Sequence, residues 1–278
     1  MKKLTIAMAV AAALSCSAAA YAKDVVITAG VQGGTYHDVY GVNLTNILRE
    51  QRISAEVQAS RGSVENLERI HAGDADVGFT QADALAAFLR SNPTAHLEIV
   101  GALGQECVYM AAQKDGKVED DDDLGEEGVR VAIGERGTGS AESWGFMRTL
   151  EPDYQEASVY YQGGIRTLAQ VKTGQMDAFM WVTSPDNRNH RFFEAVMQPD
   201  SGLVMIDVDS RKLRGELPNG EAVYTLRDVT IAEGFLSDTE VRVPCTDVLV
   251  VARGDMEDVA IEAVATAVMM NTNRIRGK

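Results

Sequence analysis

The chain has 278 residues, of which 45% are hydrophobic, and its 26 basic and 41 acidic side chains give a formal net charge of −15. That length and apolar content suffice for two lobes of ordinary domain size. The acidic balance argues against a nucleic-acid partner, because binding a phosphate backbone requires clustered Lys and Arg.

The first 22 residues have the features of a signal peptide. Lys2 and Lys3 precede an apolar stretch at 4–14, and Ala20-Tyr21-Ala22 forms a cleavage site. The stretch is too short for a stable transmembrane helix. We therefore expect export to the periplasm and a mature protein from Lys23 onward, in which 24 basic against 41 acidic residues give −17. Alternatively, Cys16 marks a lipoprotein signal.

The first expected lobe alternates strands and helices. Its strands are expected at 25–29, 55–59, 76–80 and 97–103, and its helices at 36–51, from the Arg61-Gly62-Ser63 cap to Gly73, and at 82–90. A second apolar run at 107–113 then leads out of the lobe.

The second expected lobe repeats this order. Strands are expected at 129–133, 159–161 and 176–181, and helices around Trp144, at 165–173 and at 191–197. Short strands follow at 203–206, at 224–226 and within 229–243, without an assigned register. Residues 248–251 return to the first lobe, where 255–271 forms a closing helix.

The repeat is visible in the letters themselves. Residues 25–30 and 129–134 each run into a glycine-rich loop at an offset of 104, and 66–79 matches 167–180 at an offset of 101. The sequence therefore predicts an α/β protein of two lobes with a ligand cleft between them, in which 23–107 plus 248–278 form lobe 1 and 108–247 form lobe 2. The two crossover segments suit a hinge-bending binding protein.

The candidate ligand contacts stand at helix starts and strand ends. Backbone N–H groups at a helix start, with the positive end of the helix dipole, bind anions. The expected contacts from helix starts are Gly34, Thr35, Tyr36, Ser63, Thr138, Gly139 and Ser140. For the Ser and Thr residues among them, the alternative is simple N-capping.

Other candidates follow strands or carry positive charge. Gln81 follows one strand, and Trp181 and Ser184 lie at the end of its twin; Trp181 is either an apolar wall of the cleft or part of the core. Arg61, Arg136 and Arg166 are alternatives for pairing with a carboxylate. His37 either contacts the ligand or is a surface residue.

Two cysteines, Cys107 and Cys245, remain after processing and form either a disulfide or two buried thiols. We expect no metal and no cofactor, because the four histidines lack zinc spacing and the common nucleotide and nucleophile motifs are missing. An enzyme on the same fold is the remote alternative, with Glu65, His37 and Glu142 as its acid–base candidates.

These segments together resemble the TAXI-type solute receptors of tripartite ATP-independent periplasmic (TRAP) transporters. The resemblance rests on ITAGVQGGTYHDVYGVNLTNIL, ASRGSVENLERIHAGDADVGFTQAD, GVRVAIGERGTGS and LAQVKTGQMDAFMWVTSP, and more weakly on VPCTDVLVVARGDM. The chain departs from the family pattern at His37 and Arg61.

The resemblance implies a type II periplasmic binding protein. Its ligand would be a small organic anion such as a dicarboxylate, a 2-oxo acid or an acidic amino acid. A monomeric receptor would hand this ligand to a TRAP membrane permease. The alternatives with the same fold are a ligand sensor and an ABC-type receptor.

Overall fold

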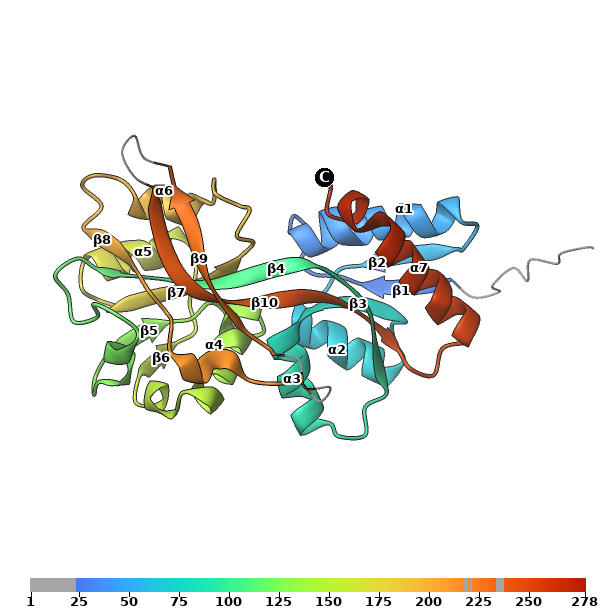
Figure 1. Ribbon diagram of the computed structural model, residues 1–278, viewed down its shortest axis with the longest axis horizontal. Coiled ribbons are helices and arrows are strands. Elements are labelled where there is room, and N and C mark those ends of the chain that lie inside the picture. Colours follow the sequence, from blue (N-terminus) through green and yellow to red (C-terminus); the bar gives the residue numbers. More distant parts are fainter. Residues whose placement is uncertain (1–23, 218–219, 221, 234–237) are drawn as a thin grey trace, which may run out of the picture.

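The computed structural model describes residues 24–217, 220, 222–233 and 238–278, and it has two lobes side by side (Figure 1). The expected signal peptide, 1–22, and Cys16 within it, lie outside the described residues. Along these described ranges we find no helix with the length and apolarity needed to cross a membrane.

The first lobe is a parallel sheet with helices on both faces. Its elements are β1 (Val25–Thr28), η1 (Thr35–Gly41), α1 (Val42–Glu50), β2 (Ala55–Gln58), α2 (Ser63–Ala72), β3 (Val77–Gln81) and α3 (Ala82–Ser91). The π-helical η1 continues directly into α1, so the helix expected at 36–51 begins with a wider turn. The C-terminal helix α7 (Asp258–Ile275) packs against α1 (Figure 1).

The second lobe repeats this arrangement in three parallel strands and adds two further strands, which pair antiparallel with the long strands that join the lobes. Its elements are β5 (Arg130–Ala132), α4 (Gly139–Leu150), β6 (Ser158–Tyr160), α5 (Ile165–Lys172), β7 (Ala178–Thr183), α6 (Arg191–Val196), β8 (Leu203–Ile206) and β9 (Thr225–Ala232). Three short 3₁₀ turns connect them: η2 (Asp122–Gly125), η3 (Pro152–Gln155) and η4 (Arg211–Arg214).

Two long antiparallel strands, β4 (Leu97–Gln113) and β10 (Thr239–Arg253), join the lobes (Figure 1). The sequence predicted β4 as two separate runs and treated the run at 248–251 as a strand of its own. In the structure β4 and β10 are each one continuous strand. The expected lobe boundaries near 107 and 248 therefore fall inside β4 and β10, respectively. The sheet order is β2-β1-β3-β10-β4-β7-β5-β6, with β8 on β4 and β9 on β10.

The internal repeat is present in the hydrogen bonds. Asp76 accepts the backbone N–H of Val26 at 3.0 Å, and its twin Asp177 accepts that of Arg130 at 2.8 Å. Each aspartate also pairs with an arginine, Asp76 with Arg253 and Asp177 with Arg130 itself. In both lobes the Gly-x-x-Asp turn therefore fixes a returning helix to the first strand.

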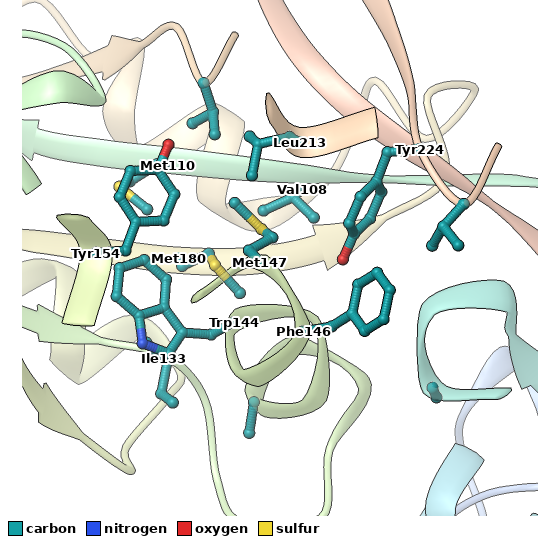
Figure 2. Packing of buried hydrophobic residues seen from close by; sticks show 14 of the residues in the cluster. Val108, Met110, Ile133, Trp144, Phe146, Met147, Tyr154, Met180, Leu213 and Tyr224 are labelled. Carbon is teal, nitrogen blue, oxygen red and sulfur yellow. The ribbon is translucent and has the colours of Figure 1, made fainter. Parts of the chain in front are cut away.

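The apolar core is shared between the lobes on one side of the sheet. One cluster of buried residues runs from Leu67 and Leu85 of the first lobe to Trp144 and Met147 of the second. Figure 2 shows its second-lobe part, where the rings of Trp144 and Tyr154 stack with centroids 5.5 Å apart. Opening the lobes widely would therefore expose apolar surface on this side.

Candidate functional site: the interlobe pocket

A pocket of about 390 Å³ lies between the lobes, at the carboxyl ends of the parallel strands. That is the edge at which open α/β sheets bind their ligands. The starts of η1, α2 and α4 line this pocket together with the ends of β3 and β7 and the middle of β4. We call it the interlobe pocket; its lining residues are Gly30, Val31, Gly34, Thr35, Tyr36, Arg61, Gly62, Ser63, Gln81, Glu106, Thr138, Gly139, Ser140, Val182, Thr183, Asn187 and His190.

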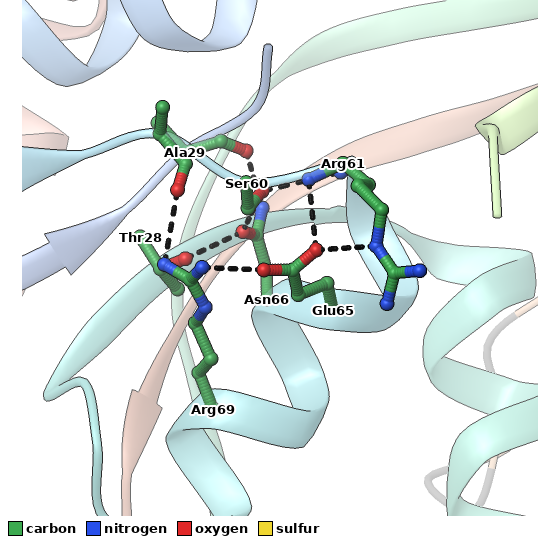
Figure 3. A network of polar contacts seen from close by, with 9 residues as sticks. Thr28, Ala29, Ser60, Arg61, Glu65, Asn66 and Arg69 are labelled. Carbon is green, nitrogen blue, oxygen red and sulfur yellow. Dashed lines mark hydrogen bonds and ion pairs between the residues drawn. The ribbon is translucent and has the colours of Figure 1, made fainter.

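A buried asparagine holds the first-lobe side of the pocket. Asn66 donates to the carbonyls of Ala29 and Phe79 and accepts from the hydroxyls of Thr28, at 2.7 Å, and Ser60, at 2.6 Å (Figure 3). One amide thus connects the ends of β1 and β3 with the loop before α2. The start of α2 is fixed at the pocket by this network.

Glycines allow the two lobes to meet across the pocket. Gly62 and Gly137 both have positive φ, 136° and 80°, and a Cβ on Gly62 would lie 3.4 Å from the carbonyl oxygen of Gly137. A Cβ on Gly139 would lie only 2.1 Å from Gln81 Oε1. A larger residue would force the Gln81 side chain to move, so glycine allows the close approach of the α4 start to the first lobe.

Two serine hydroxyls have the same role on opposite lobes. Ser63 Oγ accepts the backbone N–H of Gln81 at 3.3 Å, and Ser140 Oγ accepts that of Val182 at 3.1 Å. Each hydroxyl keeps its own hydrogen for donation, because a hydroxyl both accepts and donates. The capping alternative holds for Thr138, which is the α4 cap and accepts from Ala141 N at 3.4 Å. It does not hold for Ser63 and Ser140, because the α2 cap is Gly62 and Ser140 lies inside α4.

Gln81 carries the clearest unsatisfied polar group of the site. Its side chain is 1% exposed, and neither Oε1 nor Nε2 has a hydrogen-bond partner in the described part of the chain. A buried amide without partners costs free energy unless a ligand or water satisfies it. We therefore expect the side-chain amide of Gln81 to hydrogen-bond to a polar ligand in the pocket.

One acidic side chain, Glu106, lines the pocket from the middle of β4. Its Oε2 accepts the hydroxyl hydrogen of Tyr36 at 3.1 Å. Burial raises the pKa of Glu106 to about 7, the Tyr36 hydrogen bond opposes that rise, and the nearby Asp83 adds to it. Burial and this carboxylate in turn raise the pKa of the Tyr36 phenol.

Of the basic side chains that line the pocket, Arg61 is ion-paired and His190 is less readily protonated than usual. Arg61 lies at its rim with 76% of its side chain exposed and donates from Nε to Glu65 at 2.7 Å. Burial, and then the neighbouring Arg191, lower the pKa of His190. An anion in this pocket would therefore depend on helix starts, hydroxyls and Gln81 more than on a cation.

Nine of the predicted contact residues line the pocket. They are Gly34, Thr35, Tyr36, Arg61, Ser63, Gln81, Thr138, Gly139 and Ser140.

The structure places Trp181, Arg136, Ser184 and Arg166 elsewhere, and Arg166 is exposed at the start of α5. Trp181 is 3% exposed and packs between Tyr109 and Phe193, which corresponds to the core alternative. The guanidinium of Arg136 lies 3.6 Å from the ring centroid of Tyr161, and Ser184 Oγ accepts from the backbone of Asp186.

The remaining sequence candidates are engaged outside the pocket. His37 pairs with Asp38 at 2.7 Å, and Glu65 binds both Arg61 and Arg69. Glu142, whose pKa burial raises, lies on α4 and does not line the pocket. This acid–base set is therefore not brought together. Within the described ranges no cluster of three or more His, Cys, Asp or Glu side chains could hold a metal.

Sequence reasoning missed Glu106, Asn187 and His190. The signal for Glu106 was available, since it is the acidic residue directly before Cys107 at the predicted crossing. Cys107 and Cys245 stand opposite each other on β4 and β10 and form a disulfide, so the crossing lies at the pocket wall. Asn187 and His190 follow β7 in an irregular segment that no pattern marked.

A model of the NMT1-like family matches residues 27–276 of this chain. The chain belongs to the NMT1-like family. A search of curated proteins found no match. The narrower TAXI type that the sequence resembles stays a prediction.

Solved structures share the fold at low identity. The GluR0 ligand-binding core in complex with L-glutamate has a TM-score of 0.54 at 11% identity, with 92% of this chain and 96% of that chain covered. The substrate-binding protein of an amino acid ABC transporter has 0.52 at 11%, covering 90% and 94%. A putative sulfonate-binding protein, SsuA from Methylobacillus flagellatus KT, has 0.53 at 17%, covering 89% and 67%. The NMT1-like chain thus has the two-lobed fold of type II periplasmic binding proteins.

Proposed function

We propose that this protein is an extracytoplasmic solute-binding protein that captures a small organic anion in the interlobe pocket. The supporting observation is the convergence of three helix starts, η1, α2 and α4, on a pocket that also holds the unpartnered amide of Gln81. Helix starts bind carboxylates through backbone N–H groups without needing a cation. Candidate ligands are dicarboxylates, 2-oxo acids and acidic amino acids, and no chemical step follows binding.

The pocket size and the lobe arrangement support capture by closure. A volume of about 390 Å³ lies in the range of pockets that take small molecules. Residues of both lobes line it, so a bound ligand contacts both. Because a ligand can shift the lobes only toward the state that it binds better, the closed form must provide most of these contacts.

We further propose delivery of the ligand to a membrane permease. The TAXI resemblance favours a TRAP permease driven by an ion gradient. An ABC-type receptor is the second candidate, because two of the compared solved structures are binding proteins of ABC transporters. Uptake of labelled ligand by the reconstituted receptor and permease separates them: the TRAP proposal expects dependence on the ion gradient and none on ATP.

The pocket itself is tested by Gly139→Ala. The added methyl group would overlap the Gln81 side chain, so we expect a loss of ligand binding of at least tenfold in calorimetry. Gly145→Ala is the matched control, since Gly145 lies on the same helix with nothing within 4 Å of its Cβ position. The same affinity in both variants, or no stabilisation of the parent protein by any organic anion in a thermal-shift screen, would contradict the proposal.

A further inference from the structure

The acidic Glu106 is out of place in a pocket built for an anion. A second carboxylate would lie beside it at short range, in a site where water screens poorly. Within the described ranges no Lys, Arg or His forms an ion pair with its carboxylate, which accepts a hydrogen bond from the neutral Tyr36 hydroxyl. The pocket therefore has one negative group for which the protein provides no counter-charge.

We propose that Glu106 binds a protonated amine of the ligand, so that the ligand is an amino acid and not a plain dicarboxylate or 2-oxo acid. The ligand carboxylate then lies on the helix starts, and the amine lies against the β4 wall. This inference rests on the proposed function of the pocket and narrows its ligand class.

The geometry connects the two subsites through one side chain. Tyr36 is the second residue of η1, whose start offers backbone donors to the carboxylate, and its hydroxyl reaches Glu106. The η1 start and Glu106 line one pocket, so a single small ligand that carries a carboxylate and an amine, as an amino acid does, can contact both. Gln81, on the same pocket, can accept from the amine through Oε1 or donate to the carboxylate through Nε2.

The position of Glu106 is fixed by the strands around it. It precedes Cys107, which is bonded to Cys245 on β10 and is paired in register with Thr183 at the end of β7. Pairing of β4 on both sides and the adjacent disulfide therefore hold the backbone of Glu106 in place at the pocket wall. This is the requirement for a residue that selects between ligands by charge.

None of the described groups around Glu106 neutralises its carboxylate, so a cationic group of the ligand can do so. Asp83 on α3 disfavours its ionised form, and Tyr36 and Tyr40 on η1 face it as neutral phenols. On the side of α7, Arg276 lies against Gly104 but pairs with Asp186 at 2.9 Å. The other charged or titratable groups near this wall are Arg61, His190, Asp247, Lys278 and Arg227, which donates to Gln105 at 2.7 Å.

If Glu106 is protonated when the ligand is bound, the expected pH dependence of binding is the opposite. A neutral Glu106 could donate a hydrogen bond to a ligand carboxylate, and that ligand would bind best at low pH. An amine requires the ionised form. Given a pKa of about 7, an amine-bearing ligand should bind about tenfold more tightly at pH 8 than at pH 6, with proton release on binding at pH 6.

The experiment compares matched ligands by calorimetry at pH 6 and pH 8. Each α-amino acid is paired with the 2-oxo acid of the same skeleton, beginning with L-glutamate and 2-oxoglutarate. Glu106→Gln removes the charge at constant shape, and Glu98→Gln, an exposed residue on the same strand, is the charge-matched control. Tyr36→Phe removes the hydrogen bond that lowers the pKa of Glu106, so it should shift the pH profile upward.

We expect an amino acid to bind more tightly than its 2-oxo partner, and Glu106→Gln to weaken the amino acid at least tenfold and abolish its pH dependence. Glu98→Gln should leave both unchanged. A 2-oxo acid or dicarboxylate that binds while no amino acid does, or an amino acid unaffected by Glu106→Gln, overturns the inference and leaves the proposed function standing. Failure of every ligand in the series to bind counts against the proposed function itself.

Discussion

Among single residues, the hydroxyl groups of Ser140 and Thr35 in the interlobe pocket differ in whether they also hydrogen-bond to the protein. Ser140 anchors the end of β7 through Val182, whereas Thr35 is exposed toward the pocket at the start of η1. Both offer a hydrogen to a ligand. Only the serine also satisfies a backbone N–H of the protein, so the two residues can be told apart by stability.

We predict that Thr35→Ala and Ser140→Ala each weaken ligand binding by about 1–2 kcal/mol, through loss of one hydrogen bond. Thr35→Ala should leave the melting temperature unchanged. Ser140→Ala should lower it, because the N–H of Val182 loses its acceptor. Calorimetry and thermal unfolding of the two variants check this. A lower melting temperature with unchanged affinity in both would mean that the hydroxyls are only structural.

The unfolding free energy of the ligand-free protein should depend on pH through the Glu106 carboxyl. Burial raises the pKa of Glu106 from its ordinary value of 4.5 to about 7, so the folded state binds this proton more tightly than the unfolded state. The stabilising contribution is therefore full below pH 4.5 and is lost as the pH rises through 7. Glu106→Gln should stabilise the protein by about 1–2 kcal/mol at pH 8, discounted for partial exposure.

Urea unfolding at pH 8 and at pH 4.5 measures this difference, with Glu98→Gln again as the control. At pH 4.5 the parent and Glu106→Gln should be nearly equal. A destabilised Glu106→Gln at pH 8 would show that the carboxylate is held by contacts that favour its charge. The Glu106 side chain would then be a structural group.

Most of the first-lobe pocket residues could be predicted because each stands at a helix start beside glycine. Thr35 and Ser63 follow such glycines directly, and the dipole argument applies to both. Trp181 could not be placed, because a tryptophan at a strand end is compatible with either face of the strand. Glu106 was missed, although it stands directly before Cys107 at the predicted crossing, because the sequence does not show that the other lobe completes a cavity there.

At the scale of elements, the repeated strand–loop–helix unit was readable because its turns are local. Gly73 and Gly174 end their helices with positive φ, and Asp76 and Asp177 follow each at the same spacing. The length of β4 and β10 was not readable. Their continuity depends on pairing between segments more than 130 residues apart, which no local pattern encodes.

The disulfide at this crossing leads to the next prediction. Cys107 and Cys245 are 138 residues apart, so the bond removes considerable freedom from the unfolded chain. The double variant Cys107→Ser, Cys245→Ser should lose about 2–4 kcal/mol of unfolding free energy in urea while keeping ligand affinity within a few fold.

Reductant provides the internal control. It should destabilise the parent protein to the level of the double variant and leave the double variant unchanged. Equal stability of parent and double variant under oxidising conditions would contradict the prediction. A large loss of ligand affinity in the double variant would show that the disulfide between β4 and β10 also fixes the position of Glu106 in the pocket.

At the scale of the whole molecule, a buried polar contact joins the lobes beside the shared core. Asp83 on α3 of the first lobe accepts hydrogen bonds from Ser143 on α4, at 2.5 Å, and from Tyr224, at 2.7 Å. Burial raises the pKa of this carboxyl, and these hydrogen bonds oppose the rise. Since Asp83 is fully buried, separating the lobes at this point would expose a carboxyl group together with the apolar surface of the shared core.

The net charge of −15 leads to the last prediction, because it opposes the approach of an anionic ligand. Long-range repulsion slows association at low ionic strength, where the screening length is about 30 Å, and is largely screened at physiological salt, where it is about 8 Å. The contacts in the pocket are short-range and partly desolvated, so salt weakens them little. We therefore expect ligand affinity, measured by calorimetry at 10 and 150 mM salt (about these two screening lengths), to stay level or improve slightly. A steep loss of affinity that Arg61→Gln abolishes would instead assign the ligand to the exposed guanidinium at the rim and not to the helix starts.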